Sequence, residues 1–259
     1  MWAEKVVLLL AGGVGEPLAR RVLGGALAAL VAWTPAPAAT EQPAPEPVSI
    51  TANLSKNVAT PKKPKVGILD FESSDSITVL VNKSQPLNPV TYAPADLKVV
   101  GSVELRAEAA THLADLLAAA KANGTPLRTQ SGYRSYAAQK GTFAKWVAQY
   151  GSKHAEMYSA KPGYSEHQTG LTVDLIPATG ACQKLSRCVA QTPAGKWLLA
   201  NAADYGFILR YEQDTTDITG YGYEPWHFRF VGLPVAADYV TGDFHTYEEY
   251  VVSRMAELG

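Results

Sequence analysis

Two short stretches carry the residue types that could do chemistry together. The stretch Ser165–Asp174, SEHQTGLTVD, offers an imidazole at His167 and a carboxylate at Asp174. The stretch Glu224–His227, EPWH, adds a carboxylate and a second imidazole. Two His and one Asp form a three-ligand zinc set, and catalytic zinc sites differ from closed structural sites by leaving one position open. We therefore expect one zinc ion held by His167, Asp174 and His227.

Glu224 remains once the other three side chains are assigned to the metal. Pro225 favours an extended backbone at Glu224, and the nearby His227 keeps the carboxylate close to the zinc. Zinc lowers the pKa of a bound water towards ~7, so a carboxylate there can take a proton from it. The same carboxylate can pass that proton to a leaving amine. We predict a metallopeptidase site with Glu224 as general base; a solvated loop residue is the ordinary alternative.

The order of the motifs SxHxxGxxxD and EPWH resembles the VanY type of D-Ala-D-Ala carboxypeptidases. These are zinc peptidases of bacterial cell-wall metabolism that share a fold with lysostaphin-type peptidases and the hedgehog signalling domain. The resemblance runs from roughly Leu80 to Gly232. This sequence departs from the family pattern at Thr172, where the family often has Ala. Three further stretches carry it: Leu80–Lys83 (LVNK), Ser131–Ser135 (SGYRS) and Ile208–Tyr211 (ILRY).

The resemblance implies a fold, a substrate and further site residues. The fold would be α+β, with a small antiparallel sheet that holds the zinc and helices that flank it. The substrate would be a peptidoglycan stem peptide that loses its terminal D-Ala. Arg134 would stabilise the oxyanion or pair with the C-terminal carboxylate of the peptide, and both roles stay open. Gln139 and Ser165 would hydrogen-bond the substrate, with helix-surface and loop-capping roles as their alternatives.

Specificity and class leave alternatives open. Relatives cleave an L,D bond in a tetrapeptide or act as endopeptidases on cross-bridges, and the motifs do not distinguish these activities. The alternative from another functional class is a binding module that contains zinc but is catalytically idle. The intact Glu224 argues against it, because a binding module needs no base. A wall-binding structural protein is disfavoured by the lack of internal repeats in the sequence.

The beginning of the chain is typical of export. Arg20–Arg21 precede an apolar run over 22–33 and a small-residue AxA site, which indicates a signal peptide over 1–39. An uncleaved membrane anchor is the alternative, although the run is shorter than the ~20 apolar residues of a spanning helix. Residues 40–76 predict a Pro/Ala-rich linker, and 77–259 the folded domain. We expect an extracytoplasmic protein, secreted or anchored at the outer face of the cytoplasmic membrane.

Charge and cysteine content are consistent with this location. The chain has 23 basic and 24 acidic residues, for a net charge of -1, and no basic block that would favour a nucleic-acid partner. Nothing indicates more than a monomer. Cys182 and Cys188 lie close together without further metal ligands nearby. In an exported protein such a pair favours a disulfide, which would staple the loop after Asp174; free thiols are the alternative.

Helical and strand patterns ahead of the motifs position Arg134. The apolar face of Leu105–Asn123 predicts a helix that Gly124 ends. The alternation over Leu127–Ser131 predicts a strand that leads into the turn with Arg134. Ser135 then suits the N-cap of a helix over Tyr136–Tyr150.

Strand alternation places the expected metal ligands on polar faces. In Gly170–Leu175 the residues Leu171, Val173 and Leu175 share one face, so Asp174 lies on the other with Thr172. In Trp226–Val231 the residues His227 and Arg229 share a face opposite the aromatic side chains.

The remaining elements complete an α+β chain. Thr192 caps a helix that has Pro193 at its first position and Gly206 past its end. A further strand is expected over Phe207–Tyr211, and a C-terminal helix over Tyr247–Leu258 packs on the outside. The elements lack a regular βαβ alternation, which favours the α+β class over a parallel sheet.

Overall fold

The structure is a computed structural model, and it describes residues 66, 67 and 69–258. The expected signal peptide or anchor over 1–39, and the linker as far as residue 65, lie outside the described residues. Among the described residues, none of the helices is long and apolar enough to cross a membrane.

A four-stranded sheet in the order β3-β4-β6-β5 lies at the centre of the fold. Every neighbouring pair of strands in it is antiparallel. The register sets Asp174 on β4 opposite His227 on β6, and opposite Ser131 on β3. The sheet therefore brings two of the expected metal ligands together directly. Its strands are β3 (Leu127–Ser131), β4 (Thr172–Pro177), β5 (Phe207–Leu209) and β6 (His227–Phe230).

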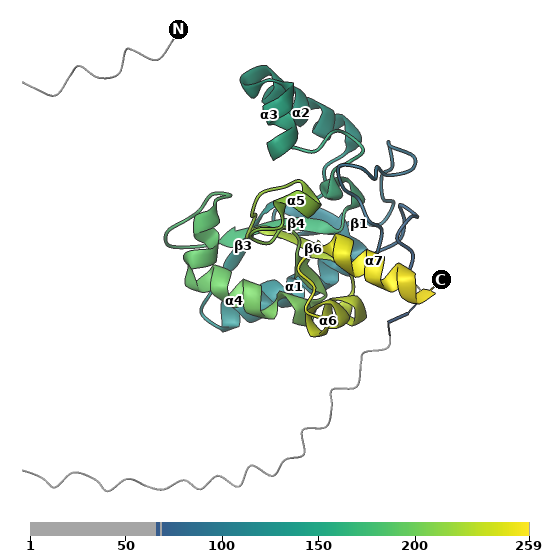
Figure 1. Cartoon of the computed structure of the whole chain (residues 1–259). Coiled ribbons are helices and arrows are strands. Elements are labelled where there is room, and N and C mark those ends of the chain that lie inside the picture. Colours follow the sequence, from purple (N-terminus) through teal and green to yellow (C-terminus); the bar gives the residue numbers. More distant parts are fainter. Residues whose placement is uncertain (1–65, 68, 259) are drawn as a thin grey trace, which may run out of the picture. The chain divides into compact units, whose positions relative to one another are not determined.

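Helices cover both faces of this sheet (Figure 1). On one side lie α1 (Ala107–Ala122), α4 (Pro193–Asn201) and α6 (Leu233–Thr241). On the other side lie α5 (Thr216–Thr219) and the pair formed by α2 (Tyr136–Tyr150) and α3 (Ser152–Tyr158). Short 3-10 helices connect these elements: η1 (Glu166–Thr169), η2 (Arg187–Gln191) and η3 (Ala202–Tyr205).

The main core fills the space between α1 and the sheet. Leu171, Val173 and Leu175 are fully buried there, as the alternation predicted, and so are Phe228 and Phe230 of the neighbouring strand. Each such side chain contributes about 1.5–3 kcal/mol by leaving water. The apolar face of β4 thus holds the strand in place, while Thr172 and Asp174 lie on its other face.

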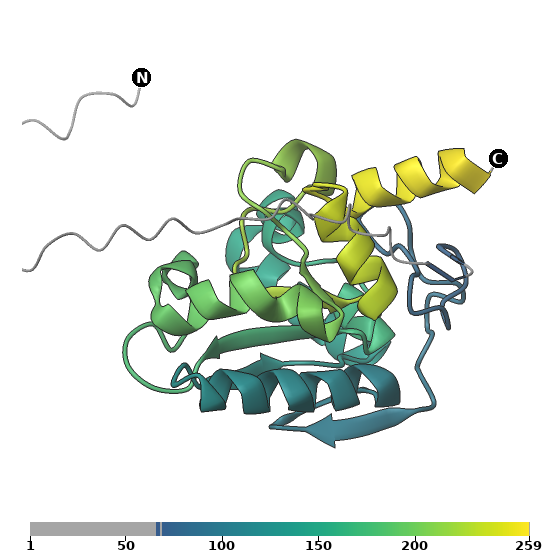
Figure 2. The same cartoon turned by 90° about the horizontal axis from the view of Figure 1, so that it is seen from below.

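A hairpin ahead of α1 corrects the expected start of that helix. Strands β1 (Leu97–Val100) and β2 (Val103–Arg106) pair antiparallel, with Lys98 opposite Leu105. Leu105 therefore belongs to a strand, and the helix expected over Leu105–Asn123 begins at Ala107 instead. The tight turn between the strands uses Gly101 at φ 60°, a conformation that favours glycine. Figure 2 shows this hairpin extending beside α1.

Both predicted helix caps are confirmed. The Ser135 hydroxyl accepts a hydrogen bond from the Ala138 amide at 3.2 Å, and α2 begins at the next residue. The Thr192 hydroxyl accepts from the Gly195 amide at 2.9 Å. The helix expected to run to Gly206 ends at Asn201 and is followed by the 3-10 helix η3, which ends at Tyr205 with Gly206 as its C-cap.

The C-terminal helix α7 (Tyr247–Leu258) has its predicted bounds, but it does more than cover the outside. Tyr247 and Tyr250 are fully buried in a second core with Val231 and Val235. Phe71 packs edge-on against both tyrosine rings, with ring centroids 6.4 Å away in each case.

Candidate active site

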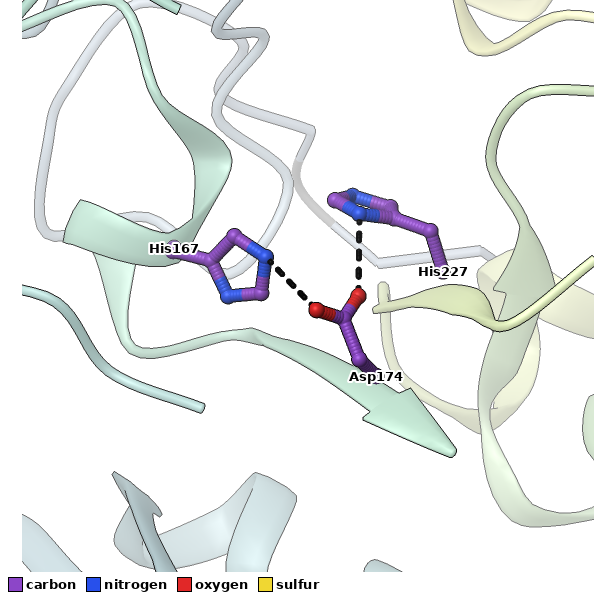
Figure 3. A group of neighbouring side chains, drawn as sticks. All are labelled: His167, Asp174 and His227. Atoms are coloured by element: carbon purple, nitrogen blue, oxygen red, sulfur yellow. Dashed lines mark ion pairs between the residues drawn. The ribbon is translucent and has the colours of Figure 1, made fainter. Parts of the chain in front are cut away.

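His167, Asp174 and His227 converge beside the sheet, and one ligand atom from each lies within 4.8 Å of the others. His167 comes from η1, Asp174 from the middle of β4, and His227 from the first position of β6. Asp174 Oδ2 lies 3.5 Å from His167 Nε2, and Asp174 Oδ1 lies 3.3 Å from His227 Nδ1. Figure 3 shows the two imidazole rings approaching this carboxylate from different sides.

The donor atoms of this cluster fit a zinc ion. His167 Nδ1 lies 2.8 Å from the Gly132 carbonyl oxygen, which can only accept a hydrogen bond. The proton is therefore on Nδ1, and the lone pair on Nε2 faces Asp174. Asp174 Oδ1 is buried and accepts no hydrogen bond from the described residues. Imidazole nitrogens with a carboxylate oxygen are a donor set that suits zinc.

Glu224 lies at the edge of the same cluster, with Oε2 3.6 Å from His227 Nδ1. The EPWH stretch turns back on itself, because the His227 amide donates to the Glu224 carbonyl at 3.0 Å. The Glu224 amide donates to the Tyr211 carbonyl at 3.1 Å, which ties the turn to the chain after β5. Burial raises the pKa of Glu224 to about 7 although His227 opposes the shift. A general base works best with a pKa near the operating pH.

The two imidazoles lie in different electrostatic surroundings. Burial lowers the pKa of His167 to about 4, so this ring is neutral at pH 7. At His227 burial acts in the same direction, but Asp174 and Glu166 outweigh it and raise the pKa to about 9. The pocket around His227 therefore favours positive charge, in the form of a proton or of a metal ion.

Arg134 is fixed on the wall beside the cluster. Its backbone amide donates to the His167 carbonyl at 3.0 Å. Its guanidinium donates to Gln139 Oε1 and to Ser131 Oγ, each at 2.9 Å. Gln139 is itself buried, and its Nε2 donates to Ser159 Oγ at 3.2 Å and to the Ala160 carbonyl at 2.6 Å.

A single cleft contains all seven residues that the sequence analysis singled out for catalysis, substrate and metal. Aromatic and aliphatic side chains complete its walls: Trp146 of α2 and Tyr158 of α3, stacked at 5.6 Å, and Leu185. The seven predicted residues that line it are Arg134, Gln139, Ser165, His167, Asp174, Glu224 and His227.

The predicted disulfide between Cys182 and Cys188 is confirmed, with the two Cα atoms 5.9 Å apart. It closes the loop that follows β4 and that carries Leu185 to the cleft. Arg128 of β3 donates to the Gln183 carbonyl at 3.2 Å, which attaches the same loop to the sheet.

Sequence reasoning assigned no role to Glu166, although it precedes His167 directly. Glu166 Oε2 lies 3.2 Å from His227 Nε2. Its other oxygen accepts hydrogen bonds from Arg210 and Arg229, which are both fully buried. A signal was available, because Arg229 shares a strand face with His227 and a buried arginine needs a carboxylate nearby.

The sequence matches a known protein family and a curated relative. A sequence model of the VanY family, described as D-alanyl-D-alanine carboxypeptidase, matches residues 102–233. The putative carboxypeptidase YodJ of Bacillus subtilis (strain 168) is 40% identical over 195 residues, which cover 71% of this chain and 70% of that protein.

Two solved structures extend the likeness to the fold. The LdcB LD-carboxypeptidase superposes with a TM-score of 0.64 at 39% identity, covering 73% of this chain and 93% of that one. A mutant of the vancomycin-resistance D,D-pentapeptidase VanY, solved in complex with Zn(II), gives a TM-score of 0.58 at 31% identity. It covers 68% of this chain and 99% of that one.

Proposed function

Because the chain belongs to the VanY family of D-alanyl-D-alanine carboxypeptidases, we propose that it removes the terminal D-Ala from peptidoglycan stem peptides in a zinc-dependent hydrolysis. The observation that carries this proposal is the convergence of His167, Asp174 and His227, with Glu224 at their edge, in one cleft. A carboxylate with a raised pKa beside such a set is the arrangement that a metallopeptidase needs.

The roles of the four residues follow from their geometry. His167 Nε2, His227 Nδ1 and Asp174 would hold one zinc ion, since these atoms face one another and Asp174 Oδ1 has no other partner among the described residues. When bound, zinc supplies Lewis-acid activation of a water and of the scissile carbonyl. Glu224 takes the proton of the attacking water and delivers it to the leaving amine.

Arg134 would act on the substrate rather than on the water. Two of its guanidinium hydrogens are used by Gln139 and Ser131, and its remaining donors are left for an oxyanion or for the terminal carboxylate. Both Nε2 hydrogens of Gln139 have protein acceptors, so Gln139 would support substrate binding by orienting Arg134. Ser165 lines the cleft and would offer its hydroxyl to the peptide.

An L,D-carboxypeptidase is the second candidate, and the likeness to the LdcB LD-carboxypeptidase favours it. That enzyme class would cleave a tetrapeptide at the same zinc site with the same residues. The catalytically idle module is disfavoured, because the cleft retains a half-buried Glu224 with its pKa raised to about 7.

The substrate would also set the place of action. Stem peptides of the cell wall lie outside the cytoplasmic membrane, so we propose that the enzyme acts there as a monomer, secreted or anchored by its N-terminal segment. The disulfide between Cys182 and Cys188 is compatible with an oxidising compartment.

The deciding experiment offers two peptides to the full-length chain loaded with zinc. One is a pentapeptide that ends in D-Ala-D-Ala, and the other is a tetrapeptide that ends in a single D-Ala. Mass spectrometry should show loss of one alanine from the pentapeptide alone, and a chelator should abolish it. Loss from the tetrapeptide alone would favour the L,D activity. No product from either peptide, with zinc demonstrably bound, would contradict a carboxypeptidase.

A further inference from the structure

Glu166 is a buried carboxylate that lies directly behind the expected metal site. Its side chain is only 1% exposed. One oxygen, Oε1, accepts hydrogen bonds from Arg210 Nε at 2.8 Å and from Arg229 Nη1 at 3.0 Å. The other oxygen, Oε2, faces His227 Nε2 at 3.2 Å. With two guanidinium donors on one oxygen, the carboxylate is held ionised and in a fixed orientation.

This contact determines which nitrogen of His227 is available to a metal. An ionised carboxylate can only accept hydrogen bonds, so His227 Nε2 carries a proton. Nδ1 is then the nitrogen that can give up its proton to a metal ion, and it faces Asp174 Oδ1 at 3.3 Å and Glu224 Oε2 at 3.6 Å. His167 is held in the corresponding way with its nitrogens exchanged, by the Gly132 carbonyl on Nδ1. Each expected ligand imidazole thus has an outer hydrogen-bond partner.

The arginines that hold Glu166 depend on the two ends of the folded region. The Glu248 carboxylate of α7 accepts hydrogen bonds from Arg210 Nη1 and Nη2, at 2.8 and 2.7 Å. It also accepts one from Asn82 Nδ2 at 3.1 Å. Arg229 Nη2 donates to the carbonyls of Ile77 at 3.1 Å and Val79 at 2.7 Å.

These supports lie outside the part of the chain that the family model matches. Residues 77–82 precede the matched region 102–233, and α7 follows it. Two arginines and two glutamates balance in charge, and removal of one partner would leave an unpaired buried charge. The helix at the C-terminal end is therefore connected to the metal site through Glu248, Arg210 and Glu166.

We propose that Glu166 is a positioning residue for the metal site, and that Glu248 of α7 supports it through Arg210. The Glu166 carboxylate keeps the proton of His227 on Nε2 and holds the ring with Nδ1 towards Asp174. This inference rests on the zinc site of the proposed function and adds the residues that orient its ligand. Such outer partners change metal affinity about 10–100-fold when they are mutated.

Glu166→Gln tests the role with almost no change of size. Both arginines donate to one oxygen of Glu166, so the amide oxygen of the new side chain will take that position. Its NH2 group then faces the protonated Nε2 of His227, so two hydrogen-bond donors point at each other. Competition with a chromophoric chelator on the full-length chain should show Zn(II) bound about 10–100-fold more weakly. Unchanged zinc affinity in the folded variant would overturn the proposal.

A matched control separates positioning from general stability. Asp238→Asn makes the same chemical change at another buried carboxylate, whose Oδ2 lies 2.9 Å from Arg254 Nε between α6 and α7. This variant should lose stability in chemical denaturation and keep its zinc affinity. If it weakened zinc binding as much as Glu166→Gln, the role assigned to Glu166 would be merely structural and the proposal would fail.

Two further measurements keep the test decisive. If Glu166→Gln does not fold, Glu248→Gln leaves Glu166 and His227 in place and should weaken zinc binding by a smaller factor; unchanged affinity would overturn the proposal. NMR of the zinc-loaded parent chain should show the His227 proton on Nε2, and a proton on Nδ1 would contradict it. A parent chain that does not bind zinc would refute the proposed function, which makes the two failures distinguishable.

Discussion

The cleft and the ionic layer behind it are both buried and charged, but their polar groups are satisfied to different degrees. Behind the expected metal ligands, Glu166 and Glu248 pair with Arg210 and Arg229 at 2.7 to 3.0 Å. Facing the cleft, Asp174 Oδ1 has no hydrogen-bond partner among the described residues. Native proteins rarely leave buried polar atoms unpaired. The contrast therefore separates a frame that supports the site from the groups that are left for ligands.

The largest effect is expected when the cleft alone is changed. Glu224→Gln should lower kcat by about 10²–10⁴-fold, because it removes the group that moves the proton. Zinc affinity and the thermal midpoint should stay close to those of the parent chain, since Glu224 belongs to the cleft and not to the frame. Hydrolysis assays, zinc titration and thermal unfolding of one preparation measure all three.

Glu212→Gln is the matched control, because Glu212 pairs with the exposed His245 away from the cluster. It should leave turnover unchanged. Full activity in Glu224→Gln would contradict the assigned mechanism.

Arg134→Lys should have the next largest effect, a loss of about 10²-fold in kcat/KM. Lysine keeps the positive charge but lacks the planar fork that contacts Gln139 and Ser131 and leaves donors for the peptide. A fall in kcat at constant KM would indicate the oxyanion role, and a rise in KM alone would indicate the terminal carboxylate. Arg128→Lys, at a residue of the same type on β3, should change neither constant; equal losses in the two variants would contradict a substrate role for Arg134.

The disulfide should affect stability more than chemistry. Cys182→Ser with Cys188→Ser opens a short loop, and the loss of chain constraint is worth about 2 kcal/mol of unfolding free energy. Urea denaturation measures this loss. The kcat should fall far less than in Glu224→Gln, because Leu185 is the one residue of this loop that lines the cleft. A loss of activity as large as that of Glu224→Gln would place the loop in the chemistry.

The smallest effect is expected at Thr172, whose buried hydroxyl oxygen also has no partner within the described part of the chain. Thr172→Ala removes an unsatisfied polar atom, so the free energy of unfolding should stay constant or rise by up to about 1 kcal/mol. Chemical denaturation measures the change, with Thr129→Ala as control, because the Thr129 hydroxyl accepts from the Ser102 amide at 2.9 Å. A loss at Thr172 equal to that at Thr129 would show that the hydroxyl is satisfied after all.

The residues of the cleft could largely be predicted because most of them lie in short motifs that resemble the VanY family, and local rules then give the orientation of several of them. Strand period two places Asp174 and His227 opposite their apolar neighbours, and the observed register sets these two residues directly across from each other. The helix caps at Ser135 and Thr192 depend on side chains within three residues of the helix start, so they could also be read locally.

The frame could not be predicted in the same way because its contacts are long-range. Arg210 and Glu248 are separated by 38 positions, and Arg229 and Val79 by 150. Hydrophobic periodicity carries no information about such pairs. The helix α6 differs from the frame, because Pro234 in its first turn is a local start signal.

The central claim is tested most directly by zinc titration of the metal-free, full-length chain with the pentapeptide present. Bound zinc and the rate of alanine release should rise together and reach a plateau at one equivalent of zinc. The reason is that His167, Asp174 and His227 form a single ligand set among the described residues. Glu224→Gln should reach the same binding plateau without releasing product. Alanine release before zinc is added, or release that does not follow bound zinc, would contradict the account.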